Sequence, residues 1–191
     1  GSMLVGGVFD SFVQDGEEVP SPRVARWDGQ RWHAMGIADV GRVRKLFRSA
    51  AGDIFALGDS SAASGTSLRK WNGQTWVAIS VPTGLTQALA IVQQADGSVL
   101  ACDSYSGAVF RWDGTQWTSL ATRTWPLYAY TMIQLPDGDL LIGTGQGTLT
   151  RLDLGSRQWT DYLPWLNGTF EALELLPRPD GGVDVLVGGG F

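Results

Sequence analysis

The sequence predicts an all-β fold, a β-propeller built from four repeats of a four-stranded antiparallel meander of about 41–45 residues each. Three observations favour this fold. A tryptophan-rich block recurs at a regular spacing, and short apolar runs recur in step with it. The 26 glycines are scattered between the apolar runs, which is typical of many short strands joined by tight turns.

The tryptophan-rich block consists of a basic residue, tryptophan, Asp or Asn, and glycine, followed shortly by a second tryptophan. Asp or Asn followed by Gly supplies the positive φ of a tight hairpin, so the block predicts a turn between two strands. The second tryptophans are 44, 41 and 42 residues apart, a spacing that matches propeller blades. The copies are Arg26-Trp27-Asp28-Gly29 with Trp32, Lys70-Trp71-Asn72-Gly73 with Trp76, Arg111-Trp112-Asp113-Gly114 with Trp117, and a degraded Arg151-Leu152-Asp153 with Trp159.

The apolar runs provide the other two strands of each unit. We name the four strands A to D in chain order, so that the block lies between C and D. Two-residue turns are expected between A and B, at Gly52-Asp53, Asp96-Gly97, Asp137-Gly138 and Asp180-Gly181. Strand A is predicted at 43–47, 88–92, 130–135 and 170–176, and strand B, which often ends in glycine, at 4–9, 54–58, 99–102, 140–143 and 186–191.

Radial packing of such sheets shields their edges, which favours a propeller over a solenoid. Residues 1–3 are interpreted as a cloning scar and residues 4–191 as a single propeller domain. The count gives four copies of A, C and D but five of B, so four units do not close neatly into a ring. Two explanations stay open: a piece of a longer propeller, or a homodimer that shares terminal strands and completes an eight-bladed ring.

The block Val24-Ala25-Arg26-Trp27-Asp28-Gly29 and the later tryptophan resemble kelch-type repeats and related bacterial propeller repeats, in the superfamily of the galactose oxidase central domain. The resemblance covers essentially the whole chain. It implies a propeller whose faces bind proteins, carbohydrates or other ligands, and no single activity. The double glycine is kept only in the first and last copies of strand B. An extracellular or bacterial cell-surface location is favoured over a cytoplasmic one.

Composition excludes several partners. The net charge is −5, and the only basic cluster, Arg42, Arg44, Lys45 and Arg48, alternates with apolar residues, so nucleic acid is not expected. No stretch is long enough for a membrane span. Cys102 is the only cysteine and His33 the only histidine, so the sequence predicts no intrachain disulfide, no metal site and no cofactor.

The candidate site lies on one face of the predicted fold. The A–B and C–D turns lie on one face, and the longer B–C and D–A loops, which include 10–23, 59–67, 103–107, 121–129 and 163–169, lie on the other. Variable loops on a rigid scaffold are where binding residues concentrate. Aromatic and polar residues of these loops are the low-specificity candidates for ligand binding: Trp125, Tyr128, Trp165, Tyr105, Asp103, Asp59, Arg123 and Asn167.

Each candidate also has a structural interpretation. The loop aromatics are equally compatible with rings that plug a central channel, and solvated loop positions are the favoured interpretation of Asp59 and Asp103, which follow strand B in successive units. The leading hypothesis is a non-catalytic module that binds a glycan or a protein on the loop face. The alternatives are the propeller portion of a carbohydrate-active enzyme and a purely structural repeat of a larger surface protein.

Overall fold

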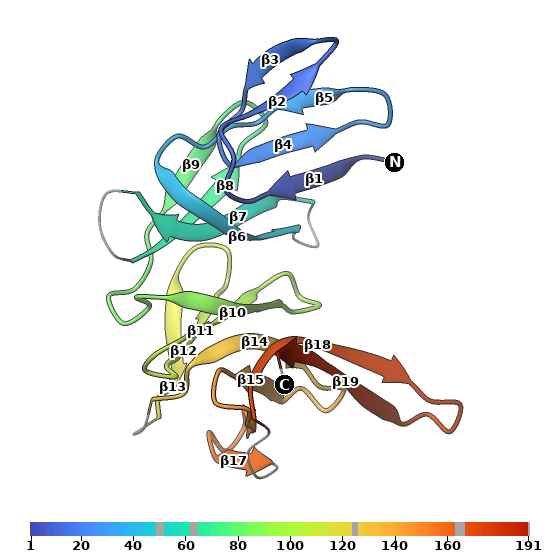
Figure 1. The fold of residues 1–191 in the computed structure, drawn as a ribbon. Helices are drawn as coiled ribbons and strands as arrows, with labels where there is room; N and C mark the ends of the chain where they lie inside the picture. Colours follow the sequence, from blue (N-terminus) through green and yellow to red (C-terminus); the bar gives the residue numbers. More distant parts are fainter. Residues whose placement is uncertain (49–51, 62–64, 124–125, 163–166, 191) are drawn as a thin grey trace. The chain divides into compact units, whose positions relative to one another are not determined.

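The computed structural model describes residues 1–48, 52–61, 65–123, 126–162 and 167–190, and every regular element among them is a β-strand (Figure 1). The all-β prediction is therefore confirmed. The part of the chain that the structure describes holds no helix long and apolar enough to cross a membrane. The chain has two compact units, Gly1–Pro82 (unit 1) and Thr83–Phe191 (unit 2).

Unit 1 contains two sheets and an extra hairpin. The first sheet has the order β1-β4-β5 and the second the order β6-β7-β8-β9, both antiparallel (Figure 1). The hairpin β2–β3 lies within 10–23, a segment predicted as a loop. The strands are β1 (Met3–Gly6), β2 (Ser11–Gln14), β3 (Glu17–Pro20), β4 (Val24–Trp27), β5 (Trp32–Ala34), β6 (Val40–Arg48), β7 (Ile54–Ser60), β8 (Thr66–Trp71) and β9 (Trp76–Ile79).

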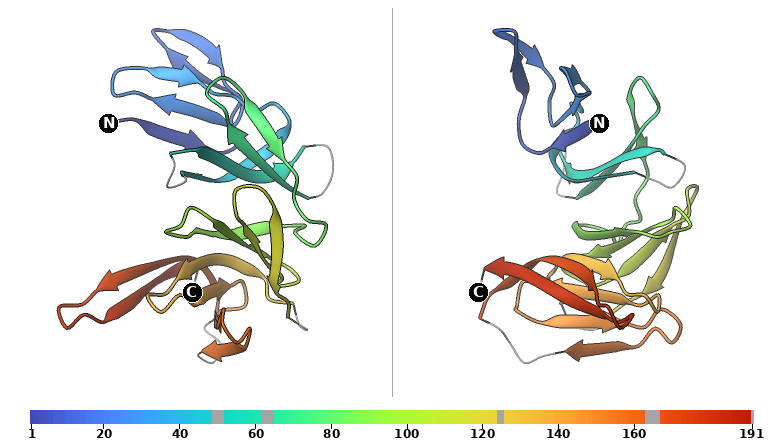
Figure 2. Two further views of the ribbon diagram at one scale, coloured as in Figure 1. Left: turned by 180° about the vertical axis from the view of Figure 1, so that it is seen from behind. Right: turned by 90° about the vertical axis from the view of Figure 1, so that its right-hand side faces the viewer.

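Unit 2 contains two four-stranded meanders, ordered β10-β11-β12-β13 and β14-β15-β16-β17, and the two-stranded ribbon β18–β19. Figure 2 shows this ribbon beside β14, with which β18 makes many contacts. The strands are β10 (Ala88–Gln93), β11 (Val99–Asp103), β12 (Val109–Trp112), β13 (Trp117–Ala121), β14 (Ala129–Gln134), β15 (Leu140–Thr144), β16 (Leu149–Leu152), β17 (Trp159–Tyr162), β18 (Thr169–Pro177) and β19 (Val183–Gly190).

The predicted strand count is confirmed in the described residues. Strand A corresponds to β6, β10, β14 and β18, and strand B to β1, β7, β11, β15 and β19. The first sheet therefore consists of B, C and D, and the last of A and B. These antiparallel meanders in chain order are the blades of a β-propeller.

The C–D turns have the positive φ that was predicted from their Asp-Gly and Asn-Gly pairs. Gly29, Gly73 and Gly114 have φ of 109°, 103° and 104°, and the residue before each glycine accepts two backbone hydrogen bonds from the far side of the turn. In the degraded copy Asp153 still accepts hydrogen bonds from the N–H groups of Gly155 and Ser156. Strands β16 and β17 therefore still pair, with Leu152 opposite Trp159.

The A–B turns differ from the prediction of two residues. Gln94 N–H donates to Ser98 O and Gly97 N–H to Gln94 O, which closes a loop of three residues. Gly97 has φ of 86°, as in a type I turn followed by a left-handed residue. The same pair of bonds closes the turns between Leu135 and Asp139 and between Arg178 and Gly182.

The tryptophans hold neighbouring blades together. In unit 1, Trp71 and Trp76 pack against a cluster of buried residues that joins both sheets and includes Val24, Met35 and Ala56. The indole N–H of Trp76 donates to Met35 O, just after β5 of the preceding sheet. Trp159 makes the same bond to Thr122 O in unit 2. In these two copies the second tryptophan therefore ties its blade to the one before.

Candidate functional site

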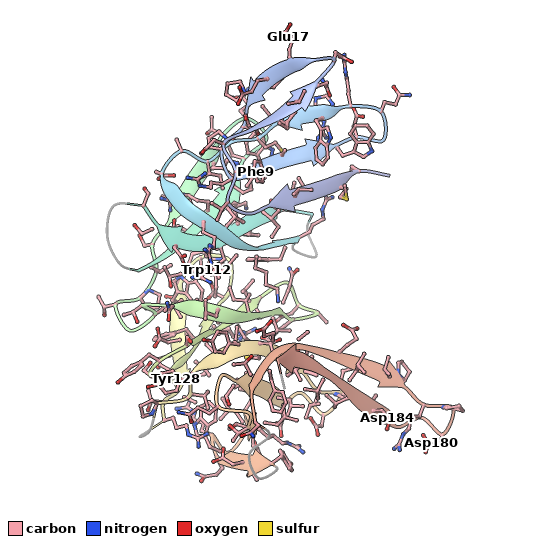
Figure 3. All side chains as sticks on the ribbon, viewed as in Figure 1. Phe9, Glu17, Trp112, Tyr128, Asp180 and Asp184 are labelled. Atoms are coloured by element: carbon pink, nitrogen blue, oxygen red, sulfur yellow. The ribbon has the colours of Figure 1, made fainter. Side chains whose placement is uncertain are left out.

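The loop face predicted from the turns can be located within unit 2. Asp180 and Asp184 lie at the tip of the β18–β19 ribbon, and Tyr128 lies at the opposite side of the unit, at the start of β14 (Figure 3). A–B turns and D–A loops are therefore on different faces, as predicted. The loop face contains the segment before β10, the β11–β12 turn, the segment before β14 and the β15–β16 turn.

Tyr105 and Tyr128 are brought together on this face. Their ring centroids are 5.5 Å apart and their planes make an angle of 85°, an edge-to-face arrangement that aromatic pairs favour. Both rings stay accessible, with 58% of Tyr105 and 37% of Tyr128 exposed. The backbone links the two loops, because Leu127 N–H donates to Tyr105 O at 3.0 Å and Ala129 N–H donates to Ser104 O at 2.9 Å. The pair is thus exposed but fixed in position.

Asp103 fixes the turn that carries Tyr105. The residue is 1% exposed, so the expected solvated loop position is wrong. One carboxylate oxygen accepts from the backbone and hydroxyl of Ser106, and the other accepts from the backbone and hydroxyl of Thr86 and from the backbone of Gln87. These five bonds join the β11–β12 turn to the segment before β10. Asp103 therefore acts as the anchor of the loop that carries Tyr105.

The pKa of Asp103 reflects two opposed effects. Burial disfavours the charged form and by itself raises the pKa. The hydrogen bonds from the backbone of Ser106 and Gln87 and from the hydroxyls of Ser106 and Thr86 outweigh burial and hold the pKa below its ordinary value. Asp103 is therefore a carboxylate in the folded chain at neutral pH, and its acceptor capacity is used within the loop.

Tyr130 adds a third ring that the sequence analysis missed. The register between β14 and β15 shifts between Ala129 and Thr131, which leaves Tyr130 at a β-bulge. Its ring is 44% exposed and packs on Gly145, where a Cβ would lie 2.2 Å from Tyr130 Cε2. Gly145 N–H also donates to Tyr128 O at 2.8 Å. We call Tyr105, Tyr128 and Tyr130 the tyrosine surface.

A bulge lies at the same distance before the A–B turn in β10, between Ala88 and Ala90. The residue at that bulge is Leu89, 41 positions before Tyr130. The bulge is thus a repeated feature, but its position becomes visible only from the strand registers.

Arg123 faces the next blade instead of the tyrosine surface. Its guanidinium makes two parallel bonds to the carboxylate of Asp161 on β17, at 2.9 and 2.7 Å, and lies 5.6 Å from the centroid of the Trp159 ring. The hydrogen bond from Arg123 is the main reason why the pKa of Asp161 is below its ordinary value. The charge of Arg123 is therefore engaged in joining β13 to β17.

The remaining candidates lie elsewhere or outside the described residues. Asp59 is in unit 1, where Arg44 binds both of its carboxylate oxygens at 2.6 and 2.9 Å. The registers align Asp103 with Gly58 and not with Asp59, because Val99 lies opposite Trp112 as Ile54 lies opposite Trp71. Asn167 is exposed at the start of the segment before β18. Trp125 and Trp165 lie outside the described residues.

Few side chains in the described part of the chain are suited to metal binding or to catalysis. No group of three or more His, Cys, Asp or Glu side chains there is arranged to hold a metal ion. Cys102 is buried in β11, and burial raises the pKa of its thiol far above the ordinary value, so it stays a thiol. His33 lies beside Asp28, with 2.5 Å between Nε2 and Oδ2, on the turn side of unit 1.

Comparison with solved structures supports the fold. No family model and no curated protein sequence matches the chain. Virginiamycin B lyase from Staphylococcus aureus superposes with a TM-score of 0.64 at 11% identity, over 97% of this chain and 73% of the lyase. YCF48 bound to D1 peptide gives 0.62 at 17% identity, over 100% of this chain and 64% of YCF48. A putative gluconolactonase gives 0.57 at 12% identity, over 92% and 73%. The β-propeller is thus supported, whereas the kelch resemblance stays a prediction.

These neighbours correct one prediction. Because the sequence contains no visible catalytic constellation, it favoured a chain without catalytic activity. The same fold is found here in a lyase and a putative gluconolactonase as well as in a peptide-bound protein. Absence of a recognisable motif in such repeats therefore does not place the chain outside the enzymes. The chain also spans 64% of the length of YCF48.

Proposed function

We propose that the chain is a ligand-binding propeller module and that the tyrosine surface of unit 2 is its contact region. The observation that carries the proposal is the exposed Tyr105–Tyr128 pair, held at 85° by loops that Asp103 and backbone bonds fix in place. Tyrosine offers large contact area with little loss of conformational entropy on binding. A pre-organised surface also avoids the cost of ordering loops.

A protein segment is the ligand class that we favour, with a glycan as the alternative. Two rings set edge to face present a ridge rather than the single flat face on which a sugar ring stacks. The peptide-bound state of YCF48 is a precedent within the fold. Asp103, Arg123 and Asp59 are left out of the proposed surface because their charges are engaged internally.

Selection of peptides from a random display library, followed by affinity measurement, tests the proposal. Tyr105→Ala and Tyr128→Ala are expected to weaken the selected peptides about tenfold or more. Tyr162→Ala is the matched control, since Tyr162 is an exposed tyrosine on the outer strand β17. Equal binding by the Tyr105 and Tyr128 variants would remove the site assignment. A glycan array in parallel decides the ligand class, and Trp125→Ala and Trp165→Ala extend the test to the two predicted tryptophans.

The predicted homodimer remains a separate proposal. Light scattering coupled to size exclusion measures the mass directly. The mass of one chain at micromolar concentration would contradict it.

A further inference from the structure

We infer that unit 1 holds a second site, a pocket for a small carboxylate with an apolar body, on the turn side of its two sheets. The pocket has a volume of about 230 Å³ and opens between the β1-β4-β5 sheet and the β6-β7-β8-β9 sheet. Its lining comes from both sheets, together with Ser2, Met35 and Gly73 beside them, and includes no residue of the tyrosine surface. The inference therefore stands apart from the proposed function.

Strand register explains how the pocket is built. In the first sheet Leu4 lies opposite Arg26, and Arg26 lies opposite His33, so the three side chains form one row on the same face. In the second sheet Arg48 lies opposite Ile54, and Ile54 opposite Trp71. The two rows line the pocket from its two sides. Each row contributes apolar surface and an arginine.

Arg26 and Arg48 are the two permanently charged side chains of the lining, and both are cationic. Arg26, His33 and Arg48 are the ionisable side chains that line the pocket, and no carboxylate does. Among the described residues, neither Arg26 nor Arg48 has an ion-pair or hydrogen-bond partner for its guanidinium. Most other arginines of unit 1 form an ion pair. Arg69 pairs with Asp39, and Arg23 pairs with Asp10. The carboxylate of Asp28 is engaged by His33 and by the backbone of its own turn.

At the equivalent place in unit 2 the leucines are buried and the arginine is paired. The equivalent rows there are Leu100, Arg111 and Thr118 in one sheet and Gln134, Leu140 and Leu152 in the next. Leu100, Leu140 and Leu152 belong to one buried cluster. Arg111 donates to Asp96 on the A–B turn and to Ser98.

The rows of unit 1 and unit 2 differ in chemical character at three positions. At the equivalent positions of unit 1, Thr118 corresponds to His33, Gln134 to Arg48 and Leu152 to Trp71. Cationic character at this position is thus a feature of unit 1 and not of the repeat.

The ligand chemistry follows from these groups. Guanidinium groups match the planar carboxylate through paired N–H donors, and Leu4, Ile54 and the Trp71 ring offer an apolar wall. The volume is below the roughly 300–1,000 Å³ of pockets for drug-sized ligands. The pocket therefore fits one side chain with a carboxylate. Two sources share this chemistry: the C-terminal residue of a peptide and a free arylalkyl acid.

His33 gives the experiment a direct readout, because it is the only histidine and its Cε1–H signal is unambiguous in a proton NMR spectrum. The probes are 3-phenylpropionate and the peptide Ala-Ala-Phe with a free carboxyl end, titrated into the full chain at constant pH. Their amides are the uncharged controls. We expect saturable shifts of the His33 signal with a Kd on the order of a millimolar or lower for the acids, and none for the amides.

Three variants separate a specific site from general attraction. Arg26→Gln and Arg48→Gln are each expected to weaken binding about two- to fivefold, the range for partly exposed charge pairs. Arg42→Gln, on the same strand as Arg48 but outside the pocket, is expected to change nothing. Tighter binding of the peptide than of phenylpropionate identifies a chain terminus as the ligand, and the reverse identifies a free acid. Absence of a saturable shift, equal shifts with the amides, or equal weakening by Arg42→Gln would overturn the inference.

Discussion

The indole N–H of Trp76 donates a hydrogen bond to the backbone oxygen of Met35, 2.5 Å away and just after the last strand of the preceding sheet. Trp159 repeats the bond with Thr122 in unit 2. The repeated tryptophan is thus required for more than its apolar area, since it also satisfies a carbonyl at the end of the neighbouring blade. This requirement explains why tryptophan persists at Trp159 when the first tryptophan of that copy has become Leu152.

Replacing Trp76 by phenylalanine tests the bond. The variant keeps an aromatic ring but leaves Met35 O without its donor, at a cost of about 1 kcal/mol beyond the lost ring area. Trp32→Phe is the matched control, because Trp32 holds the same repeat position and its indole N–H has no hydrogen-bond partner among the described residues. Urea unfolding of both variants gives the free energies of unfolding. Equal losses in the two variants would show that the bond contributes nothing measurable.

Asp103→Asn should destabilise the chain strongly. An amide replaces one acceptor oxygen by a donor group that faces N–H and O–H donors, so we expect a loss of about 2–4 kcal/mol at pH 7. Asp59→Asn removes a partly exposed ion pair with Arg44 and should cost at most about 1 kcal/mol. Similar losses for both substitutions, measured by urea unfolding, would contradict the anchoring role of Asp103.

The pH dependence gives Asp103 an independent test. Its folded-state pKa is lowered, so its contribution to stability is fully present above the unfolded pKa of about 3.9 and is lost as the pH falls through the folded value. The difference in unfolding free energy between the natural chain and Asp103→Asn should therefore shrink as the pH falls from about 5 to about 2. A difference that stays constant over this range would show that the ionised carboxylate is not the stabilising species.

Gly58→Ala tests why strand B so often ends in glycine. A Cβ at Gly58 would lie 1.9 Å from the backbone oxygen of Arg42 on the bulged strand β6, so the backbone must move. We expect a loss of about 2 kcal/mol or more in the free energy of unfolding. Gly41→Ala is the control in the same pair of strands, because its Cβ would meet no atom closer than 3.6 Å. Thermal unfolding that ranks the two variants alike would refute the steric explanation.

The sequence was sufficient for the features that depend on neighbours in the chain. Asp-Gly and Asn-Gly pairs predicted the C–D turns, and the spacing of tryptophans predicted the blades. The three-residue A–B loops were missed because an Asp-Gly pair occurs in both two- and three-residue hairpins, and only the Gln94–Ser98 bonds separate them.

Features that depend on register between strands could not be predicted. Tyr130 is exposed because a bulge interrupts its pairing, and Asp103 is buried because the segment with Thr86 and Gln87 covers it. The pocket of unit 1 joins Arg26 to Arg48, which are 22 positions apart in the chain and lie in different sheets. Hydrophobic periodicity carries no information about such contacts between sheets.

A double-mutant cycle on Arg123 and Asp161 completes the test of the site residues. If Arg123 serves to join β13 to β17, Arg123→Gln and Asp161→Asn should each lower the free energy of unfolding, and the double variant should lose less than their sum. The coupling should be about 0.5–1 kcal/mol, because Asp161 is only partly shielded from solvent. Urea unfolding of the four proteins measures it. Strictly additive losses would mean that the pair does not stabilise the blade contact and would return Arg123 to the candidates for ligand binding.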